Sequence, residues 1–318
     1  MRHSTTFLML LIVASILVLM FLNLVLGSVS IPLKSVWNII CGLGDEPVTW
    51  QNIVWKSRLP QALTALVAGA GLAISGLQMQ TVFRNPLAGP SVLGISSGAS
   101  MGVAFVVLLS GNLGGVALSK LGFMGEIALS IAAVIGSLSV MALIVYVSQK
   151  VKGNVTLLII GVMIGYVANA VIGVLKFFSV EEDIRAYVIW GLGSFSRVSG
   201  NQMMLFVVIM AILIPLSFLL IKTLNLMLLG DGYARNLGLN IKRARLLVIT
   251  SAGVLTAIVT AYCGPVIFLG LAVPHLCRAI FQTSDHRVLM PAVLFAGAAL
   301  ALACNLIVRM PGFEGALP

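Results

Sequence analysis

Charged residues are scarce in this sequence. Asp, Glu, Lys and Arg make up 9% of its 318 residues, whereas hydrophobic residues make up 60%. The mean hydropathy is +1.12. A chain with so few charges cannot hide its apolar side chains in a core surrounded by water. The composition therefore excludes an ordinary water-soluble protein and predicts a membrane protein.

Signals for nucleotide hydrolysis and for metal binding are also missing. No Gly-Lys dipeptide occurs anywhere in the sequence, so the phosphate-binding loop GxxxxGK[ST] is absent. The four cysteines lie far apart without a CxxC pair, which indicates neither a disulfide framework nor a zinc site. We expect no metal and no cofactor on this chain. If the protein moves a substrate uphill, another protein must supply the energy.

Ionisable side chains are almost absent from the interior of the long apolar segments. The exception is His275, which follows Pro274. Ion-coupled carriers usually need an intramembrane charge, so an ion-coupled carrier or channel is an alternative with little support. We expect His275 to satisfy backbone groups loosened by Pro274 rather than to relay protons. An intramembrane enzyme using His275 or Cys277 is a further alternative, but no nucleophile–base pair is in view.

Nine apolar segments recur along the chain and predict an all-α polytopic membrane protein, a transmembrane helix bundle forming one domain over residues 1–318. The segments are Phe7–Leu26, Ala62–Phe83, Val92–Leu109, Ile127–Val147, Thr156–Phe178, Met203–Ile221, Leu246–Cys263, Val266–Phe281 and Leu289–Val308. The boundary between the seventh and eighth segments, at Gly264-Pro265, is indistinct. We expect the first segment to be a retained helix, because its apolar core is long and no clean small-x-small cleavage site follows it.

The distribution of charge favours a cytoplasmic N-terminus. The net charge is +10, and basic residues are more numerous on the side that then becomes cytoplasmic. This topology explains the charge better than nucleic-acid binding does. The longest polar stretch between two apolar segments, Leu229–Leu247, lies on the same side and overlaps an expected cytoplasmic coupling loop over residues 223–245.

Two segments carry small residues at four-residue spacing, a pattern that lets helix backbones approach closely. In the third segment these residues are Gly94, Gly98 and Gly102. In the fifth they are Gly161, Gly165, Asn169 and Gly173. We expect packing for the third segment. For the fifth, packing and pore lining are both open, because Asn169 adds a hydrogen-bonding group that lipid would reject.

Four stretches occur in order along the chain. They are RLPQ at Arg58–Gln61, RNPLAGPSVLGISSGA at Arg84–Ala99, GDGYARNLGLNIKRAR at Gly230–Arg245 and GPVIFLGLAVPHLCR at Gly264–Arg278. Together the stretches resemble the FecCD-type permeases, the membrane subunits of type II ABC importers for iron-siderophores, haem and vitamin B12. Members of that family have ten transmembrane helices.

The resemblance implies a non-enzymatic permease subunit in the bacterial inner membrane, embedded in lipid. It implies a second permease subunit, expected to be identical, and two cytoplasmic ATPase subunits that bind ATP and Mg. A substrate-binding protein would dock on the outer side. The cargo would be an iron chelate, haem or vitamin B12, and the sequence does not choose among them.

The family's cytoplasmic loop before the seventh span folds into short helices that sit in a cleft of the ATPase. The resemblance places this coupling function at Gly230, Asp231, Ala234, Arg235, Leu237 and Gly238. Asp231 would cap the helix start, Ala234 and Leu237 would face the ATPase, and Gly238 would end the helix in a left-handed turn. A solvated basic loop is the alternative.

Two arginines are implied to pair with carboxylates of the binding protein, namely Arg58 and Arg309. An interface arginine with no partner protein is the alternative for each.

The resemblance also assigns a tight inner turn to Asn85 and Pro86 and an interrupted eighth span to Pro274 and His275. Many relatives have glycine where this chain has Ile267. Relatives continue into a tenth helix after a Leu-Pro pair, here Leu317-Pro318, so we expect the sequence to be truncated there.

Overall fold

The computed structural model describes residues 2–114, 123–151, 153–198 and 200–309, and the end at Leu317-Pro318 lies outside them. The described chain is helical and contains no strand. The α-helices are α1 (Arg2–Val25), α2 (Leu33–Cys41), α3 (Val48–Asn52), α4 (Leu59–Phe83), α5 (Ile95–Gly114), α6 (Phe123–Lys150), α7 (Asn154–Phe177), α8 (Glu181–Gly191), α9 (Gly200–Phe218), α10 (Ile221–Leu228), α11 (Asp231–Asn236), α12 (Ile241–Cys263), α13 (Leu269–Phe281) and α14 (His286–Val308). A π-helical stretch (Ile53–Arg58) precedes α4, and 3₁₀ turns lie at Pro90–Leu93 and Phe195–Arg197.

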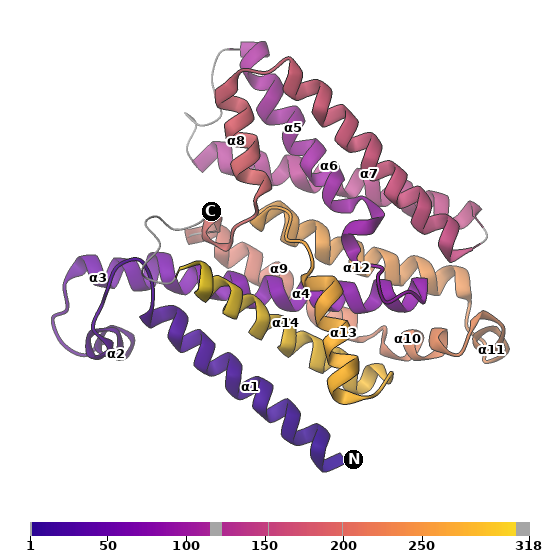
Figure 1. Cartoon of the computed structure of the whole chain (residues 1–318), viewed down its shortest axis with the longest axis horizontal. Coiled ribbons are helices and arrows are strands. Elements are labelled where there is room, and N and C mark those ends of the chain that lie inside the picture. The colour runs from indigo at the N-terminus through magenta and orange to yellow at the C-terminus, as the bar shows by residue number, and fades with distance from the viewer. Residues whose placement is uncertain (1, 115–122, 152, 199, 310–318) are drawn as a thin grey trace.

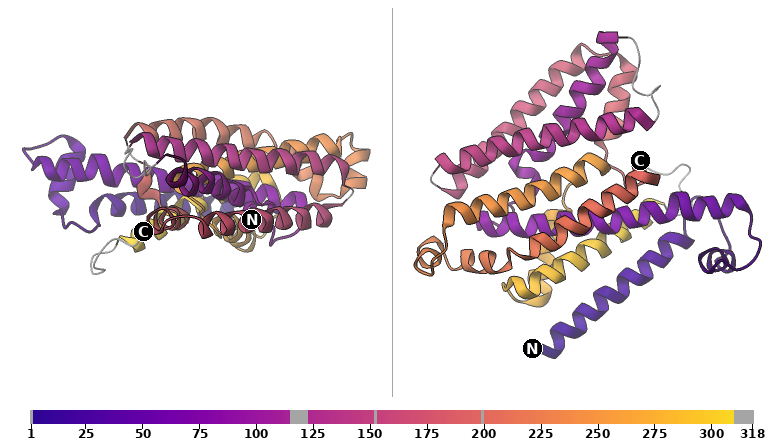
Figure 2. Two further views of the ribbon diagram at one scale, coloured as in Figure 1. Left: turned by 90° about the horizontal axis from the view of Figure 1, so that it is seen from above. Right: turned by 180° about the vertical axis from the view of Figure 1, so that it is seen from behind.

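Helix α4 is the centre of the bundle. It lies between α12 and α14, as the view from behind shows, and also packs against α9 and α13 (Figure 2). Every residue from Ala68 to Phe83 is buried. The helix is therefore apolar on all sides because neighbouring helices, rather than lipid, surround it.

Close helix contacts at α4 depend on glycine. A Cβ added at Gly76 would lie 1.6 Å from the carbonyl oxygen of Gly270 in α13, and one added at Gly69 would lie 2.3 Å from that of Gly297 in α14. Only a residue without a side chain permits these approaches. The same holds between α5 and α6, where Gly98 and Gly102 face the backbone around Gly136. The predicted packing of the third segment is confirmed.

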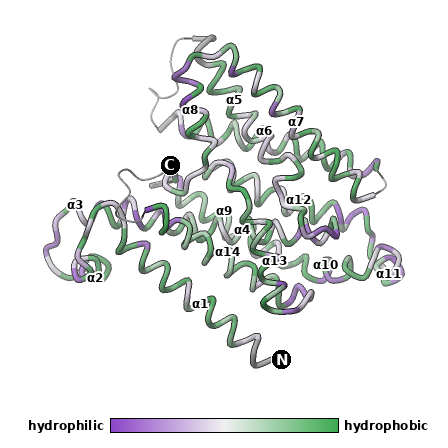
Figure 3. Tube along the Cα trace, in the orientation of Figure 1, coloured by the Kyte–Doolittle hydropathy of each residue, from purple (hydrophilic) through white to green (hydrophobic). Residues whose placement is uncertain are grey.

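Within the described residues, six helical stretches are long and apolar enough to cross a membrane: Thr5–Val25, Val48–Phe83, Gly125–Lys150, Val155–Phe177, Ile241–Cys263 and His286–Val308. A seventh candidate is the pair Gln202–Phe218 and Ile221–Leu228, bent by 45°. Apolar residues follow these helices along most of their length (Figure 3). All nine predicted segments are helical, but the third and eighth form shorter apolar helices, Ile95–Leu109 and Leu269–Phe281.

The bundle has two distinct ends. In Figure 1, α10 and α11 lie at the right-hand end and α2 and α3 at the left-hand end, while the N-terminus lies at the bottom, to the right of centre. Polar residues colour both ends of the tube (Figure 3). The polar loop predicted from the sequence therefore projects from the end opposite α2 and α3.

The prediction that Pro274 interrupts the eighth span is wrong. Helix α13 runs through Pro274 without a break, and the non-helical stretch lies earlier, between the end of α12 and Leu269. The carbonyl that loses its helical partner at Pro274 belongs to Gly270, four residues earlier. This carbonyl lies against Gly76 of α4. The carbonyl without a helical donor is therefore at the point where α4 and α13 approach each other closely, at Gly76.

Candidate functional site

The polar segment that joins α10 to α12 has a defined structure. Gly230, with φ of +99°, precedes α11, and Gly238, with φ of +85°, follows it. The amide of Gly238 donates to the carbonyl of Arg235, and that of Leu239 donates to the carbonyl of Ala234, both at 2.9 Å. This pair of bonds is a Schellman motif, which needs a left-handed residue at the position of Gly238. The left-handed turn predicted at Gly238 is confirmed.

Asp231 does not cap α11. Gly230 occupies the N-cap position, and no side-chain capping bond forms there. The Asp231 carboxylate instead accepts a hydrogen bond from Arg84 and lies 3.6 Å from Nη2 of Arg245. Arg84 also donates to the carbonyl of Met227 at 3.3 Å. Asp231 therefore attaches α11 to the end of α4 and the start of α12.

The outward face of α11 differs from the prediction. Ala234 is fully buried, so it faces the bundle and cannot face a partner. Leu237 is 61% exposed, Tyr233 is 73% exposed, and Leu229 and Arg235 are also exposed. Tyr233 lies within α11, whereas Leu229 comes before Gly230 and Leu237 follows the last residue of the helix. Sequence reasoning missed Tyr233 and Leu229, which no continuous helix connects.

The two predicted docking arginines meet at the opposite end of the bundle. A Cβ added at Gly27 would lie 3.1 Å from Nη2 of both Arg58 and Arg309. Arg58 is only 1% exposed, and its guanidinium donates to the carbonyls of Leu24, at 2.8 Å, and Val25, at 2.7 Å, and to that of Val29. Its guanidinium is therefore enclosed by main chain, contrary to the exposed position that docking requires.

Arg309 is half-buried just beyond α14. Its Nη1 is buried without a hydrogen-bond partner among the described residues. Burial, and then the charge of Arg58, lower the pKa of Arg309 to about 10. A cation without an acidic partner in this position would gain from an anionic ligand.

The four small residues of α7 do not share one environment. Gly161 and Gly165 are buried against the start of α5, close to Leu93 and Gly94 respectively. Asn169 and Gly173 are exposed further along the helix. The first half of the pattern is thus helix packing, whereas the second half faces away from the described chain.

The turn between α4 and α5 has the tight form expected from its sequence. The side-chain oxygen of Asn85 accepts a hydrogen bond from the amide of Leu87 at 2.9 Å, across Pro86. This side-chain turn brings the chain back toward the bundle, where Pro90 begins a 3₁₀ turn.

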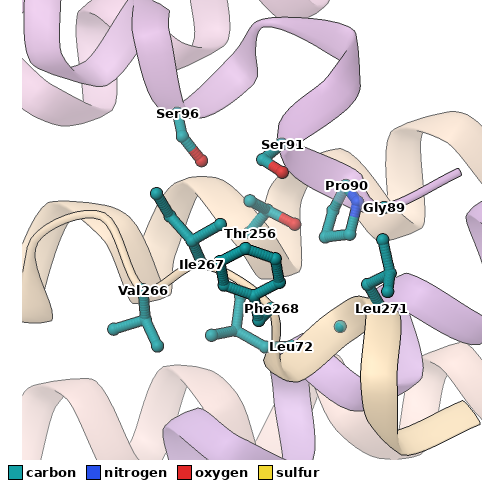
Figure 4. Close-up of a pocket in the computed structure, with 11 residues that line it drawn as sticks. Leu72, Gly89, Pro90, Ser91, Ser96, Thr256, Val266, Ile267, Phe268 and Leu271 are labelled. Carbon is teal, nitrogen blue, oxygen red and sulfur yellow. The ribbon is translucent and has the colours of Figure 1, made fainter. Parts of the chain in front are cut away.

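A pocket lies beside this turn (Figure 4). Its empty volume is about 540 Å³, counting the part open to solvent. The hydroxyl groups of Ser91, Ser96 and Thr256 line one side, and Ile267 and Phe268 lie across from them. None of the four α7 residues predicted to line a pathway belongs to this lining.

Phe268 stands in an unusual backbone conformation at the pocket. Its φ is +69° and its ψ is −32°, and the amide of Leu269 donates to the carbonyl of Ile267 at 2.9 Å. A tight three-residue turn with positive φ is strained for a residue with a side chain. The Phe268 side chain is nevertheless 72% exposed, so burial of the ring does not explain the conformation.

His275 lies on α13 near this segment, with an exposed side chain. The break in the chain falls before α13 instead of at Pro274, so His275 is not placed to bind loosened backbone groups there. Among the residues that the structure describes, no group of three or more His, Cys, Asp or Glu side chains is arranged to hold a metal ion.

Comparison with known proteins identifies the family. The FecCD transport family matches residues 15–318. The chain is 34% identical to the vitamin B12 import system permease protein BtuC of Klebsiella pneumoniae, covering 84% of this chain and 77% of that protein. It is also 34% identical to the hemin transport system permease protein HmuU of Yersinia pestis, covering 89% and 81% respectively.

A solved structure of a metal-chelate type ABC transporter in an inward-facing conformation has the same fold. The TM-score is 0.80 at 27% sequence identity, and the match covers 95% of this chain and 90% of the other. The fold is thus that of an ABC transporter permease, a multi-pass inner-membrane protein. By sequence and by structure, this chain belongs to the FecCD transport family.

Proposed function

We propose that this chain forms the translocation pathway of an importer and that α11 is the contact site for a separate cytoplasmic ATPase. The observation that carries the proposal is the exposed apolar face of α11. Tyr233 and Leu237 are exposed at one end of the bundle, on a segment held by Asp231 and ended by Gly238. Exposed aromatic and aliphatic side chains on a fixed support are typical of protein interfaces.

The cargo that we propose is an iron chelate, haem or vitamin B12. The relatives named for vitamin B12 and hemin transport support this class. Two copies of the chain would assemble with two ATPase subunits, which bind ATP and Mg, because this chain has no phosphate-binding loop of its own. The end that carries α11 would face the cytoplasm together with the N-terminus.

On the outer side, Arg309 is the better candidate for docking a substrate-binding protein. Its Nη1 has no described partner, whereas Arg58 is occupied by main-chain carbonyls. We propose that Arg58 supports Arg309 from below, since their guanidinium groups meet at Gly27. A carboxylate of the binding protein would offset the repulsion between the two cations.

Purification of the tagged chain from its native host in mild detergent tests the proposal. We expect a P-loop ATPase in equal stoichiometry. A double variant, Tyr233→Asp and Leu237→Asp, should reduce the recovered ATPase by about tenfold or more, because interface hot spots of this type contribute roughly 2 kcal/mol each. A matched control is Val155→Asp, which replaces an exposed apolar residue of α7.

Reproducible purification of the unmodified chain without any ATPase would reject the importer assignment and favour an ion-coupled carrier or a channel. Equal loss of ATPase in the Val155→Asp control would show that α11 is not the specific contact.

A further inference from the structure

A buried polar network holds α10 immediately before the α11 segment. His286, at the start of α14, is 1% exposed. Its Nε2 lies 2.8 Å from the hydroxyl of Thr81 in α4, and its Nδ1 lies 2.7 Å from Oδ1 of Asn225 in α10. One histidine therefore connects three helices that are far apart in the sequence.

The surrounding bonds determine which atoms donate. The backbone amide of His286 donates to Oδ1 of Asn225 at 2.9 Å, and Nδ2 of Asn225 donates to the carboxylate of Asp285 at 2.6 Å. These two bonds fix the orientation of the Asn225 amide. Nδ1 of His286 must then carry a proton and donate to the same oxygen. In the neutral ring Nε2 carries no proton, and the single hydroxyl proton of Thr81 is within reach of both Nε2 and the carbonyl of Leu77, each 2.8 Å away.

The network lies between α11 and the pocket. Asn225 is three residues before the end of α10, after which Gly230 leads into α11. Thr81 is three residues before Arg84, which binds both Asp231 and the carbonyl of Met227. The turn that follows Arg84 supplies Gly89, Pro90 and Ser91 to the pocket.

A second buried network offers a comparison. Asn305 of α14 donates to Oδ1 of Asn23 at 2.7 Å, and Asn23 donates to the carbonyl of Leu302 at 3.0 Å. Both asparagines are buried, like His286. That network joins α1 to α14 and involves no residue of α10. Of these two networks, the His286 network is the one that reaches α10, where it adds to the bonds that Arg84 makes with Asp231 and the carbonyl of Met227.

We propose that Asn225 and His286 are positioning residues that keep α10 and α11 in fixed relation to the end of α4. A displacement of α11 by a bound ATPase then reaches the turn at Asn85 and the pocket wall through Thr81 and Arg84. Buried hydrogen-bonded side chains transmit such a displacement because breaking them leaves unpaired polar groups. The transmission of an ATPase displacement rests on the proposed function, whereas the hydrogen-bond network itself does not.

Hydrogen exchange of the complete transporter in detergent tests the geometry. Asn225→Ala and His286→Ala should each raise the exchange rate of amides 221–230 by about tenfold or more, since each removes buried hydrogen bonds. Alanine has a higher helix propensity than asparagine, so the first substitution cannot raise exchange through propensity. The matched control is Asn305→Ala, which should leave these amides unchanged.

Transport provides a second readout. In vesicles containing the transporter, with vitamin B12 or haem as the tested cargo, both variants should hydrolyse more ATP for each cargo molecule moved.

If one variant fails to fold, the result for the other variant tests the proposal. Unchanged exchange at 221–230 in a folded variant, or an equal increase in Asn305→Ala, would overturn the proposal. An unchanged ratio of ATP to cargo would overturn transmission. Absence of any ATPase in the unmodified complex would instead reject the proposed function, while the exchange experiment would still test the network.

Discussion

At the scale of single residues, glycine sets how closely the helices pack. Gly76 faces the carbonyl of Gly270 so closely that a Cβ would lie 1.6 Å from the oxygen. Gly76→Ala should therefore force α4 and α13 apart and lower the free energy of unfolding by at least about 1–3 kcal/mol, as overpacking does. Thermal unfolding in detergent measures the loss.

The matched control for this substitution is Gly232→Ala. Gly232 lies in α11 with no neighbour within 4 Å of an added Cβ, so its replacement should change stability by less than about 0.5 kcal/mol. Equal melting temperatures for the two variants would show that α4 and α13 are not in contact at Gly76.

Arg58 acts on stability rather than on docking. Its guanidinium binds the carbonyls of Leu24 and Val25 at the end of α1 and that of Val29 in the segment before α2. Arg58→Met retains most of the side-chain length but leaves these carbonyls unpaired, and each costs about 1–3 kcal/mol where it is buried. We expect a lower melting temperature with this variant.

Lys34→Met is the comparison for Arg58, because Lys34 is an exposed basic residue near the same end. It should leave the melting temperature unchanged. If Arg58→Met kept full stability and lost only affinity for the binding protein, the docking role predicted from the sequence would be restored.

The difference between Gly238 and Arg58 shows which residue roles the sequence can reveal. Gly238 ends a helix through the bond of its own amide to Arg235 and that of the next amide, Leu239, to Ala234, so its turn is visible in a local pattern. Arg58 binds carbonyls 29 to 34 residues distant. The resemblance assigned it to docking, and nothing in the local sequence shows which groups surround it.

At the scale of elements, the stretch between α12 and α13 combines strain with exposure. Phe268→Gly removes the side chain that makes positive φ unfavourable, and little buried surface is lost because the ring is largely exposed. We expect this variant to be more stable by about 1 kcal/mol. Thermal unfolding again provides the measurement.

Phe268→Ala separates strain from the loss of the ring. Alanine retains the steric conflict at positive φ, so this control should give no increase in stability. A similar gain in both variants would assign the effect to the ring rather than to the backbone.

Predictions for two elements, the α11 segment and the eighth apolar segment, had different outcomes. The α11 segment formed with its expected end, because glycine and the surrounding polar residues act locally. The boundary expected at Gly264-Pro265 is present, whereas the interruption predicted at Pro274 is not, because α13 continues through that residue. The Gly270 carbonyl freed by Pro274 lies against Gly76 of α4, a tertiary contact that the local sequence does not show.

At the scale of the whole molecule, the membrane makes helix positions predictable and helix partners unpredictable. All nine apolar segments form helices, since unpaired backbone groups are too costly in lipid. Their arrangement depends on pairs such as Gly69 with Gly297, which only the folded chain brings together. The polar network of Thr81, Asn225 and His286 escaped the sequence analysis for the same reason.

The placement of charge across the molecule predicts its orientation. Arg235, Lys242 and Arg243 are exposed around α11, whereas Glu181 and Glu182 are exposed at the start of α8. Positively charged loops remain on the cytoplasmic side. Cys41 on α2, which is exposed, should therefore react with a membrane-impermeant thiol reagent in spheroplasts.

For the opposite end, Tyr233→Cys provides the matching probe in a background where the exposed Cys41 and Cys304 are replaced by serine. Its side chain is exposed, so accessibility should depend only on the side of the membrane on which α11 lies. We expect labelling in inverted vesicles and none in spheroplasts. Labelling of Tyr233→Cys in spheroplasts would place α11 outside, where no cytoplasmic ATPase could reach it, and would contradict both the orientation and the coupling role that depends on it.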